Sequence, residues 1–172
     1  MRFIRPSFGP LVAGALCVAM AGCAGTDDVA GSDVPGSTQS VETLVRMGDY
    51  TLARGDAMTA IAFYRRAHAA EPQALGPLLR LGAAAARAGD FSNAADAYEA
   101  ALRVEPLNGE AQRGLGNALV ALGRPGEALP HFETALSVDE DPRAFNSSGV
   151  ALDLLGRHDD AQFYYREGLA QS

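Results

Sequence analysis

Residues 114–136 have the sequence GLGNALVALGRPGEALPHFETAL, and the spacing of its glycines, alanines and aromatic residue recurs along most of the chain. Glycines return every 34 residues in two series: Gly48, Gly82 and Gly116, and Gly55, Gly89 and Gly123. Three further positions keep this step: Ala60, Ala94 and Ala128; Tyr64, Tyr98 and Phe132; and Ala67, Ala101 and Ala135. Recurrence of particular residue types at one fixed step indicates an array of repeated structural units.

A fourth copy follows, with one residue deleted from the connection before it. Its residues stand 33 after their counterparts in the third copy: Gly149, Gly156, Ala161 and Tyr165. Gly168 takes the place of the second alanine. Pro72 and Pro106 also keep the period, but the third member falls on Glu140, with Pro142 two residues later. The sequence therefore predicts about four copies.

Each recurring position has a physical role in a helix–turn–helix unit. The first glycine lets two helices approach closely, and the second can take the positive φ at which helices often end. The two alanines lie on one face of the second helix with the aromatic side chain between them, and the proline stops that helix. The sequence predicts an all-α fold with helices over residues 41–54, 57–70, 75–88, 91–104, 109–122, 125–138, 142–155 and 158–170.

This pattern resembles the tetratricopeptide repeat (TPR) family over residues 41–171, with repeats at about 41–74, 75–108, 109–141 and 142–171. The resemblance implies a solenoid of stacked antiparallel helix pairs. Pro125 suits the first turn of its helix, whereas Pro130 lies inside the same helix and is expected to kink it or shift its start.

In the TPR family the first helices of successive copies line a concave groove, so the resemblance implies where a protein or peptide partner binds. It places these residues there: Glu42, Val45, Arg46, Asp49, Leu52, Leu79, Arg80, Ala83, Arg87, Glu110, Arg113, Asn117, Val120, Arg143, Asn146, Val150 and Asp153. The candidate polar contacts are Arg46, Asp49, Arg80, Arg87, Arg113, Asn117, Arg143, Asn146 and Asp153. The mixture suits an extended or helical peptide. The alternative is that many of these arginines are solvated helix surface.

Some TPR domains hold a peptide C-terminal carboxylate with Lys, Arg and Asn side chains spread over successive copies. Arg113 and Asn117 lie one helical turn apart and resemble a fragment of that set. Val45 and Leu79 occupy the position of Arg113 in the other copies, so the sequence does not complete a carboxylate clamp.

A second candidate surface lies at the C-terminal end. Phe163, Tyr164 and Leu169 fall on the last predicted helix, and no further copy follows to cover it. Tyr165 is expected to belong to the core. The other three side chains are expected to form an exposed patch for a partner or for a second copy of the protein.

Residues 1–22 are expected to be a signal peptide, because Arg2 and Arg5 precede the apolar run 11–21. Small residues directly before Cys23 resemble the lipobox of bacterial lipoproteins, in which the cysteine is acylated and the peptide is cut before it. The alternative is an uncleaved membrane anchor. Such an anchor needs an apolar run of about 20 residues, and the run 11–21 is shorter. Residues 23–40 are expected to form the lipidated cysteine and a flexible linker. Ala24 after the cysteine favours the outer membrane, by resemblance to lipoprotein sorting.

No constellation of residues points to catalysis, a metal or another cofactor. His68, His131 and His158 fall in different copies without metal-ligand spacing, and the recurrent glycines follow the repeat and not a phosphate-binding loop. The formal net charge of −7 argues against a nucleic-acid partner. The sequence thus predicts a binding protein and not an enzyme.

The sequences of the last two copies indicate a more specific class of binding protein. Residues 114–136 and GVALDLLGRHDDAQFYYREGLA at 149–170 resemble the TPR lipoproteins of the tight-adherence (Flp) pilus machinery, the TadD-like proteins. The resemblance implies a pilotin-like scaffold that binds the outer-membrane secretin or another pilus assembly component. The alternative is a general cell-envelope scaffold for peptidoglycan or outer-membrane assembly.

Overall fold

A computed structural model describes residues 39–139 and 141–171. Within these residues the chain forms eight helices: α1 (Val41–Ala53), α2 (Ala57–Ala70), α3 (Leu75–Arg87), α4 (Phe91–Val104), α5 (Gly109–Ala121), α6 (Pro125–Val138), α7 (Pro142–Leu154) and α8 (His158–Ala170). The predicted all-α fold of about four helix pairs is confirmed. Every helix begins where the sequence predicts, and only the first helix of each pair ends one residue earlier than predicted. The predicted signal peptide, Cys23 and the predicted linker up to residue 38 lie outside the described residues.

Short polar side chains fix most of the helix starts. Ser40, Asp56, Asp90, Asn108 and Asp141 each accept a hydrogen bond from a backbone N–H two or three residues further on. These bonds satisfy N–H groups that have no partner inside the helix.

Glycine fixes the turn inside each pair. The φ angle is +85° at Gly55, and its counterparts Gly89, Gly123 and Gly156 have values of 75–77°. Residues with a Cβ rarely adopt this conformation, whereas glycine does so readily. The predicted role of the second glycine is therefore confirmed in all four copies.

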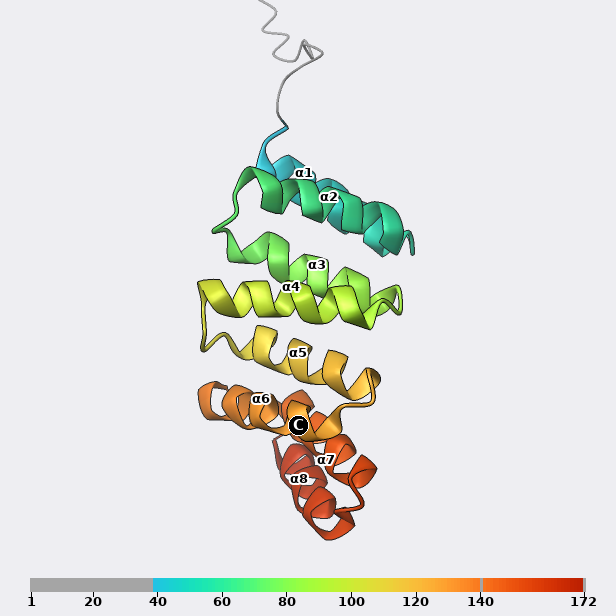
Figure 1. The fold of residues 1–172 in the computed structure, drawn as a ribbon, viewed down its shortest axis with the longest axis vertical. Helices are drawn as coiled ribbons and strands as arrows, with labels where there is room; N and C mark the ends of the chain where they lie inside the picture. Colours follow the sequence, from blue (N-terminus) through green and yellow to red (C-terminus); the bar gives the residue numbers. More distant parts are fainter. Residues whose placement is uncertain (1–38, 140, 172) are drawn as a thin grey trace, which may run out of the picture. The chain divides into compact units, whose positions relative to one another are not determined.

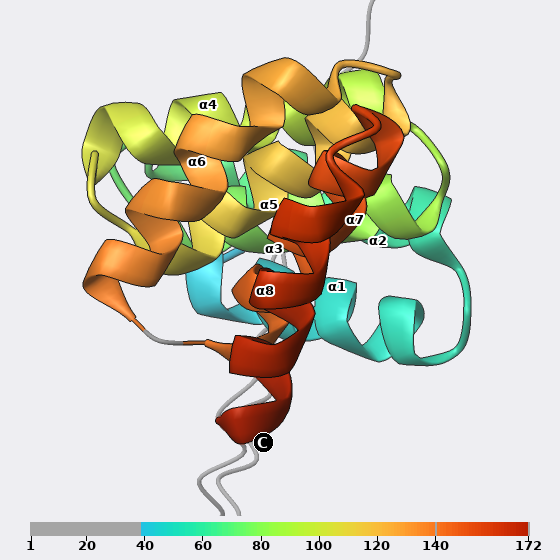
Figure 2. The same ribbon diagram turned by 90° about the horizontal axis from the view of Figure 1, so that it is seen from below.

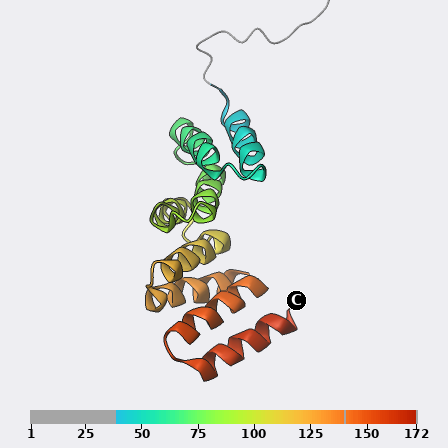
Figure 3. The ribbon, with the colours of Figure 1, turned by 90° about the vertical axis from the view of Figure 1, so that its right-hand side faces the viewer.

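Each helix packs against its successor in the chain, and α5 also contacts α3 and α7, so the pairs stack in chain order. Figure 1 shows this order from α1 and α2 to α7 and α8, and Figure 3 shows the two helices of each pair side by side. Figure 2 views the stack from the end formed by α7 and α8. The first helices thus follow one another, and each of α2, α4 and α6 packs against the first helix before it and the first helix after it.

The first glycine of each copy lies directly against an aromatic ring of its own second helix. A Cβ added at Gly48, Gly82, Gly116 or Gly149 would overlap the ring of Tyr64, Tyr98, Phe132 or Tyr165, respectively. The predicted close approach of the two helices is confirmed, and the aromatic side chain fills the space that the missing Cβ leaves. The alanines before these rings, Ala60, Ala94, Ala128 and Ala161, are all completely buried.

The prolines divide into two groups. Pro72 and Pro106 follow the ends of α2 and α4 by two residues, as predicted. Pro125 is the first residue of α6, and the helix continues through Pro130 to Val138. The start of α6 is therefore not shifted, and the kink at Pro130 stays a prediction.

Among the described residues, no helix is both long and apolar enough to cross a membrane.

Candidate functional site

Three hollows follow one another along the first helices, and together we call them the groove. The first has a volume of about 310 Å³ and is lined by Leu52, Tyr64, Gly76, Leu79, Arg80, Ala83 and Glu110. The second, of about 220 Å³, is lined by Ala83, Ala86, Phe91, Tyr98, Glu110, Arg113, Gly114, Asn117 and Ala118. The third, of about 280 Å³, is lined by Gly109, Glu110, Arg113, Ala135, Asp139, Asp141, Arg143 and Ala144.

Shared residues make the groove continuous. Ala83 lines the first and second hollows, Arg113 lines the second and third, and Glu110 lines all three. All three residues lie on first helices, which is where the resemblance to the TPR family implies a binding surface. That a partner occupies the groove stays a prediction.

Small side chains form much of the groove's floor, and charged ones stand at its edge. Ala83 and Ala86 are half-buried and present only a methyl group to the groove, whereas Arg80 and Glu110 are exposed. Such a surface can bury apolar side chains of a peptide and also hydrogen-bond to its backbone or charges.

A tyrosine, an aspartate and an arginine join the first two copies at one edge of the groove. The hydroxyl of Tyr64 donates to Asp49 Oδ1 over 2.7 Å, and Arg80 Nη1 of the next copy lies 2.5 Å from the same oxygen. Burial of the ring and the bond to Asp49 both raise the pKa of Tyr64. Asp49 and Arg80, both predicted site residues, are therefore paired with each other across the junction.

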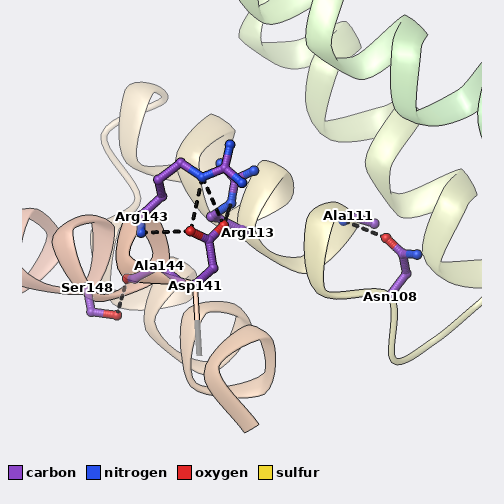
Figure 4. A network of polar contacts seen from close by, with 7 residues as sticks. All are labelled: Asn108, Ala111, Arg113, Asp141, Arg143, Ala144 and Ser148. Carbon is purple, nitrogen blue, oxygen red and sulfur yellow. Dashed lines mark hydrogen bonds and ion pairs between the residues drawn. The ribbon is translucent and has the colours of Figure 1, made fainter. Parts of the chain in front are cut away.

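Two arginines converge on one carboxylate at the other end of the groove (Figure 4). Asp141 Oδ1 accepts hydrogen bonds from the backbone N–H and Nε of Arg143, over 2.9 and 3.0 Å, and Arg113 Nε lies 3.2 Å from Oδ2. Burial works against the charge of Asp141, but the hydrogen bonds and charges of these arginines hold its pKa below the ordinary value. The predicted site residues Arg113 and Arg143 thus meet at the N-cap of α7.

This pairing bears on the carboxylate clamp. Arg113 already has a carboxylate partner in Asp141, which belongs to the same chain. Asn117 is exposed and lines the second hollow, one turn away. A peptide carboxylate would therefore compete with Asp141 for Arg113. This competition is a second argument against a carboxylate clamp, besides the incomplete set of clamp residues.

Two of the predicted polar contacts lie at the ends of the array. Arg46 lines a separate hollow of about 530 Å³ together with Met47, Tyr50 and Phe63. Asp153 lies at the other end on α7, and its pKa is lowered by hydrogen bonds from His158 Nδ1 and the Tyr165 hydroxyl, over 2.8 and 2.9 Å. These positions correspond to groove positions of the middle copies, but among the described residues no copy lies before the first or after the last.

Arg87 and Asn146 complete the predicted set. Both are exposed, and neither is among the residues that line the three hollows. The Oδ1 atom of Asn146 lies over the backbone of Gly168 on α8, so this side chain faces the second helix of its own copy.

The predicted C-terminal patch is divided between two sides of α8. The ring of Tyr164 lies edge-on to Phe163, with 5.6 Å between centroids, and 6.3 Å from the ring of Phe145 on α7. Leu169 is 74% exposed but lies six residues after Phe163, and therefore on another side of the helix. The ring of Tyr165 takes the core position against Gly149 and remains partly exposed.

Sequence reasoning missed a polar pair inside the third copy. Gln112 is buried, donates from Nε2 to the carbonyl of Pro106 over 2.9 Å, and accepts from His131 Nδ1 over 2.7 Å. Burial lowers the pKa of His131. The repeat register offered a signal, because the same two positions hold Leu78 and Ala97 in the second copy.

Within the part of the chain that the structure describes, no group of three or more His, Cys, Asp or Glu side chains could hold a metal ion. His158 contacts one carboxylate and His131 contacts an amide.

Comparisons with known proteins agree with the fold. The family model described as tetratricopeptide repeat matches residues 79–137 and 113–172, which together span more than half of the chain. An uncharacterized protein, y4yS, of Sinorhizobium fredii (strain NBRC 101917 / NGR234) is 50% identical over 52 residues, which make up 30% of this chain and 29% of that relative. The chain thus covers less than a third of this relative's length.

Solved structures give the same picture. A crystal structure of MamA matches with a TM-score of 0.72 and 24% identity over 78% of this chain and 79% of that one. The thermophilic TPR protein TTC0263 of Thermus thermophilus matches with a TM-score of 0.67 and 22% identity over 76% of this chain and 74% of that one. At this identity the likeness concerns the fold alone. Together with the four helix pairs and the matched family model, it establishes that the chain belongs to the tetratricopeptide repeat family.

Proposed function

We propose that this protein is a lipid-anchored scaffold of the outer membrane that binds a segment of a protein partner in its groove. TPR domains bind protein partners, and the observation that carries the proposal here is the continuity of the three hollows through Ala83, Glu110 and Arg113. A continuous groove can accept a segment of several residues, whereas separate pockets would accept only single side chains.

The side chains that line the groove indicate which kind of peptide segment can bind there. The first hollow combines Leu52 and Leu79 with the exposed Arg80 and Glu110. The third is lined by three acidic and two basic side chains, most of them paired with each other. A segment with apolar side chains towards the first two copies and polar ones towards the fourth fits this gradient.

We assign the partner to the tight-adherence (Flp) pilus machinery, with the secretin as the first candidate. Support comes from residues 114–136 and 149–170, whose sequences resemble those of the TadD-like lipoproteins of that system. The acylated Cys23 would hold the scaffold at the membrane facing the periplasm, and the linker of residues 23–40 would let the groove search for its partner.

The experiment captures the partner with the full-length chain in its own cell. A photo-cross-linking residue in place of Leu79, in the first hollow, is expected to join the protein to a secretin or another pilus component, identified by mass spectrometry. Capture of peptidoglycan or outer-membrane assembly enzymes instead would refute the pilus assignment. It would favour the alternative, a general cell-envelope scaffold, for which loss of the gene should weaken the envelope while pili remain.

A matched pair of variants tests the groove itself. Ala83→Arg places a long side chain in the first two hollows and is expected to abolish cross-linking from position 79. Ala100→Arg makes the same change at an equally half-buried alanine in a separate hollow between α2, α3 and α4. Equal capture by both variants would show that the partner binds elsewhere.

The anchor has its own test. Cys23→Ala removes the proposed acylated thiol, so the protein should leave the membrane fraction, since acyl chains are the only anchor that we propose. Retention of Cys23→Ala in the outer membrane would refute lipidation at this residue.

A further inference from the structure

The first copy exposes a face that the other copies bury. We call it the N-terminal face, and it is the hollow of about 530 Å³ lined by Thr43, Arg46, Met47, Tyr50, Thr51, Thr59 and Phe63. Its volume exceeds that of each hollow of the groove. Most of the surface that lines this hollow is apolar, and Arg46 adds a charged group to it.

The 34-residue register shows what this face does in the middle copies. Tyr50 is 63% exposed, whereas its counterparts Ala84 and Ala118 are buried to 0% and 2% exposure. Met47 is 37% exposed, and its counterpart Leu81 is only 9% exposed. In the second copy, Leu81 lines a hollow together with Arg65 and His68 of the preceding copy. The N-terminal face is therefore a junction surface without a preceding copy among the described residues.

The fourth copy exposes the complementary surface, which we call the C-terminal face: Val150, Asp153, Tyr165 and Leu169. Its members stand at positions through which earlier copies meet the following one. His68, the counterpart of Leu169, lines a hollow with Leu78 and Leu81 of the next copy. Val150 and Leu169 are 45% and 74% exposed.

The charges of the two faces match the polar contact of the first junction. There the hydroxyl of Tyr64 holds Asp49, and Arg80 of the following copy pairs with that carboxylate. On the C-terminal face the hydroxyl of Tyr165, at the position of Tyr64, holds Asp153 together with His158 Nδ1. Asp153 lies one turn beyond the position of Asp49, and its side chain remains 41% exposed. Arg46 occupies the position of Arg80, so it would reach this carboxylate from a stacked chain.

We propose that a second copy of this chain covers the N-terminal face with its C-terminal face, so that the helix stack continues from chain to chain. Residues 24–38 are a poorer cover, because their apolar side chains are limited to Val29, Val34 and two alanines. The contact is heterologous, with Arg46 of one chain meeting Asp153 of the next, and it can repeat along a row of chains. The net charge of −7 opposes association, which keeps the contact weak and reversible.

Cysteine pairs in two differently tagged full-length chains test this geometry. One chain carries Arg46→Cys and the other Asp153→Cys, and a short thiol-reactive cross-linker is added to cells that make both. The product that contains both tags is expected, and it should be lost when both chains carry Arg46→Cys or both carry Glu133→Cys. Chains without an added cysteine give the background from Cys17 and Cys23.

Charge variants in the same assay separate the contact from simple misfolding. Arg46→Glu is expected to lower the amount of cross-link between a second pair of sites, Tyr50→Cys and Leu169→Cys, by about tenfold. Combining Arg46→Glu in one chain with Asp153→Arg in the other should restore it.

Two results would overturn the proposal. Equal products from the mixed pair and from two Arg46→Cys chains would show a symmetric contact and not a head-to-tail one. Absence of every product, together with cross-linking of Tyr50→Cys to cysteines placed within residues 24–38 of its own chain, would show that the leading segment covers this face.

Discussion

Tyr64 and Tyr98 occupy the same position in the first and second copies, but the following copy meets their rings in different ways. At the first junction, Tyr64 donates to Asp49, and Arg80 of the second copy pairs with the same carboxylate. At the second junction, Gly114 replaces the arginine, and its backbone lies directly against the ring of Tyr98. Polar side chains at the edge of the groove hold the first junction together. Close packing of the Gly114 backbone against the Tyr98 ring holds the second.

The difference shows how much freedom the repeat leaves. The helices of both junctions stack in the same order, and both tyrosines are buried. Burial raises the pKa of Tyr98, and the negative charge of Glu110 adds to this, whereas Asp49 contributes directly at Tyr64. The recurring residues therefore determine where the tyrosine rings lie. Residues outside the recurring positions, here Arg80 and Gly114, determine which contacts hold the next copy. A partner can compete for Arg80 at the first junction, but it meets no comparable group at Gly114.

The largest expected effect comes from adding a side chain at the second junction. Gly114→Val would place carbon atoms inside the ring of Tyr98, so the ring or the helices must shift. Overpacking of this kind costs about 1–3 kcal/mol, and we expect the upper end because the contact is with a buried ring. Arg80→Val makes the matched change at the first junction and loses only a partly exposed ion pair, about 1 kcal/mol or less. Urea unfolding of both variants measures the difference, and equal losses would show that the two junctions are closed alike.

Residue types at fixed spacing were enough to predict the helices. Gly55 and its counterparts end the first helices because they alone adopt a positive φ there without strain, and capping side chains such as Asp56 and Asp90 fix the next starts. These are local effects of one or a few neighbouring residues, so the sequence carries them directly.

The groove could be predicted only in part. Its course along the first helices follows from the resemblance to the TPR family, but the surroundings of Arg46 and Asp153 differ from those of their counterparts because, among the described residues, no further copy packs beside them. The pairing of Arg113 with Asp141 joins α5 to the N-cap of α7, a contact that the spacing of the recurring residues does not encode. Gly114 was overlooked for the same reason, since it breaks the register and contacts the preceding copy.

A smaller effect is expected from removing the tyrosine hydroxyls. Tyr64→Phe deletes a hydrogen bond to a charged acceptor and leaves Asp49 with fewer partners, which should lower the free energy of unfolding by about 1–2 kcal/mol. Tyr98→Phe is the matched variant at the second junction, where Ala83 stands in place of Asp49, and it should change stability by less than about 0.5 kcal/mol. Both are measured by urea unfolding. A larger loss in Tyr98→Phe would mean that the second junction depends on a polar contact of its hydroxyl.

The smallest effect concerns pH and arises beside the second junction, where Gln112 bonds both Pro106 and His131. Burial lowers the pKa of His131 in the folded protein, so the unfolded chain binds the proton more readily, with the ordinary value of 6.5. The stability that the neutral imidazole contributes is therefore fully present above pH 6.5 and is lost as the pH falls through the folded-state pKa. Replacing the pair by the residues of the second copy, Gln112→Leu with His131→Ala, should remove this loss. Unfolding free energies of both proteins at about pH 7.5 and about pH 5.5 test this expectation, and the same decrease in both would assign the pH dependence to other groups.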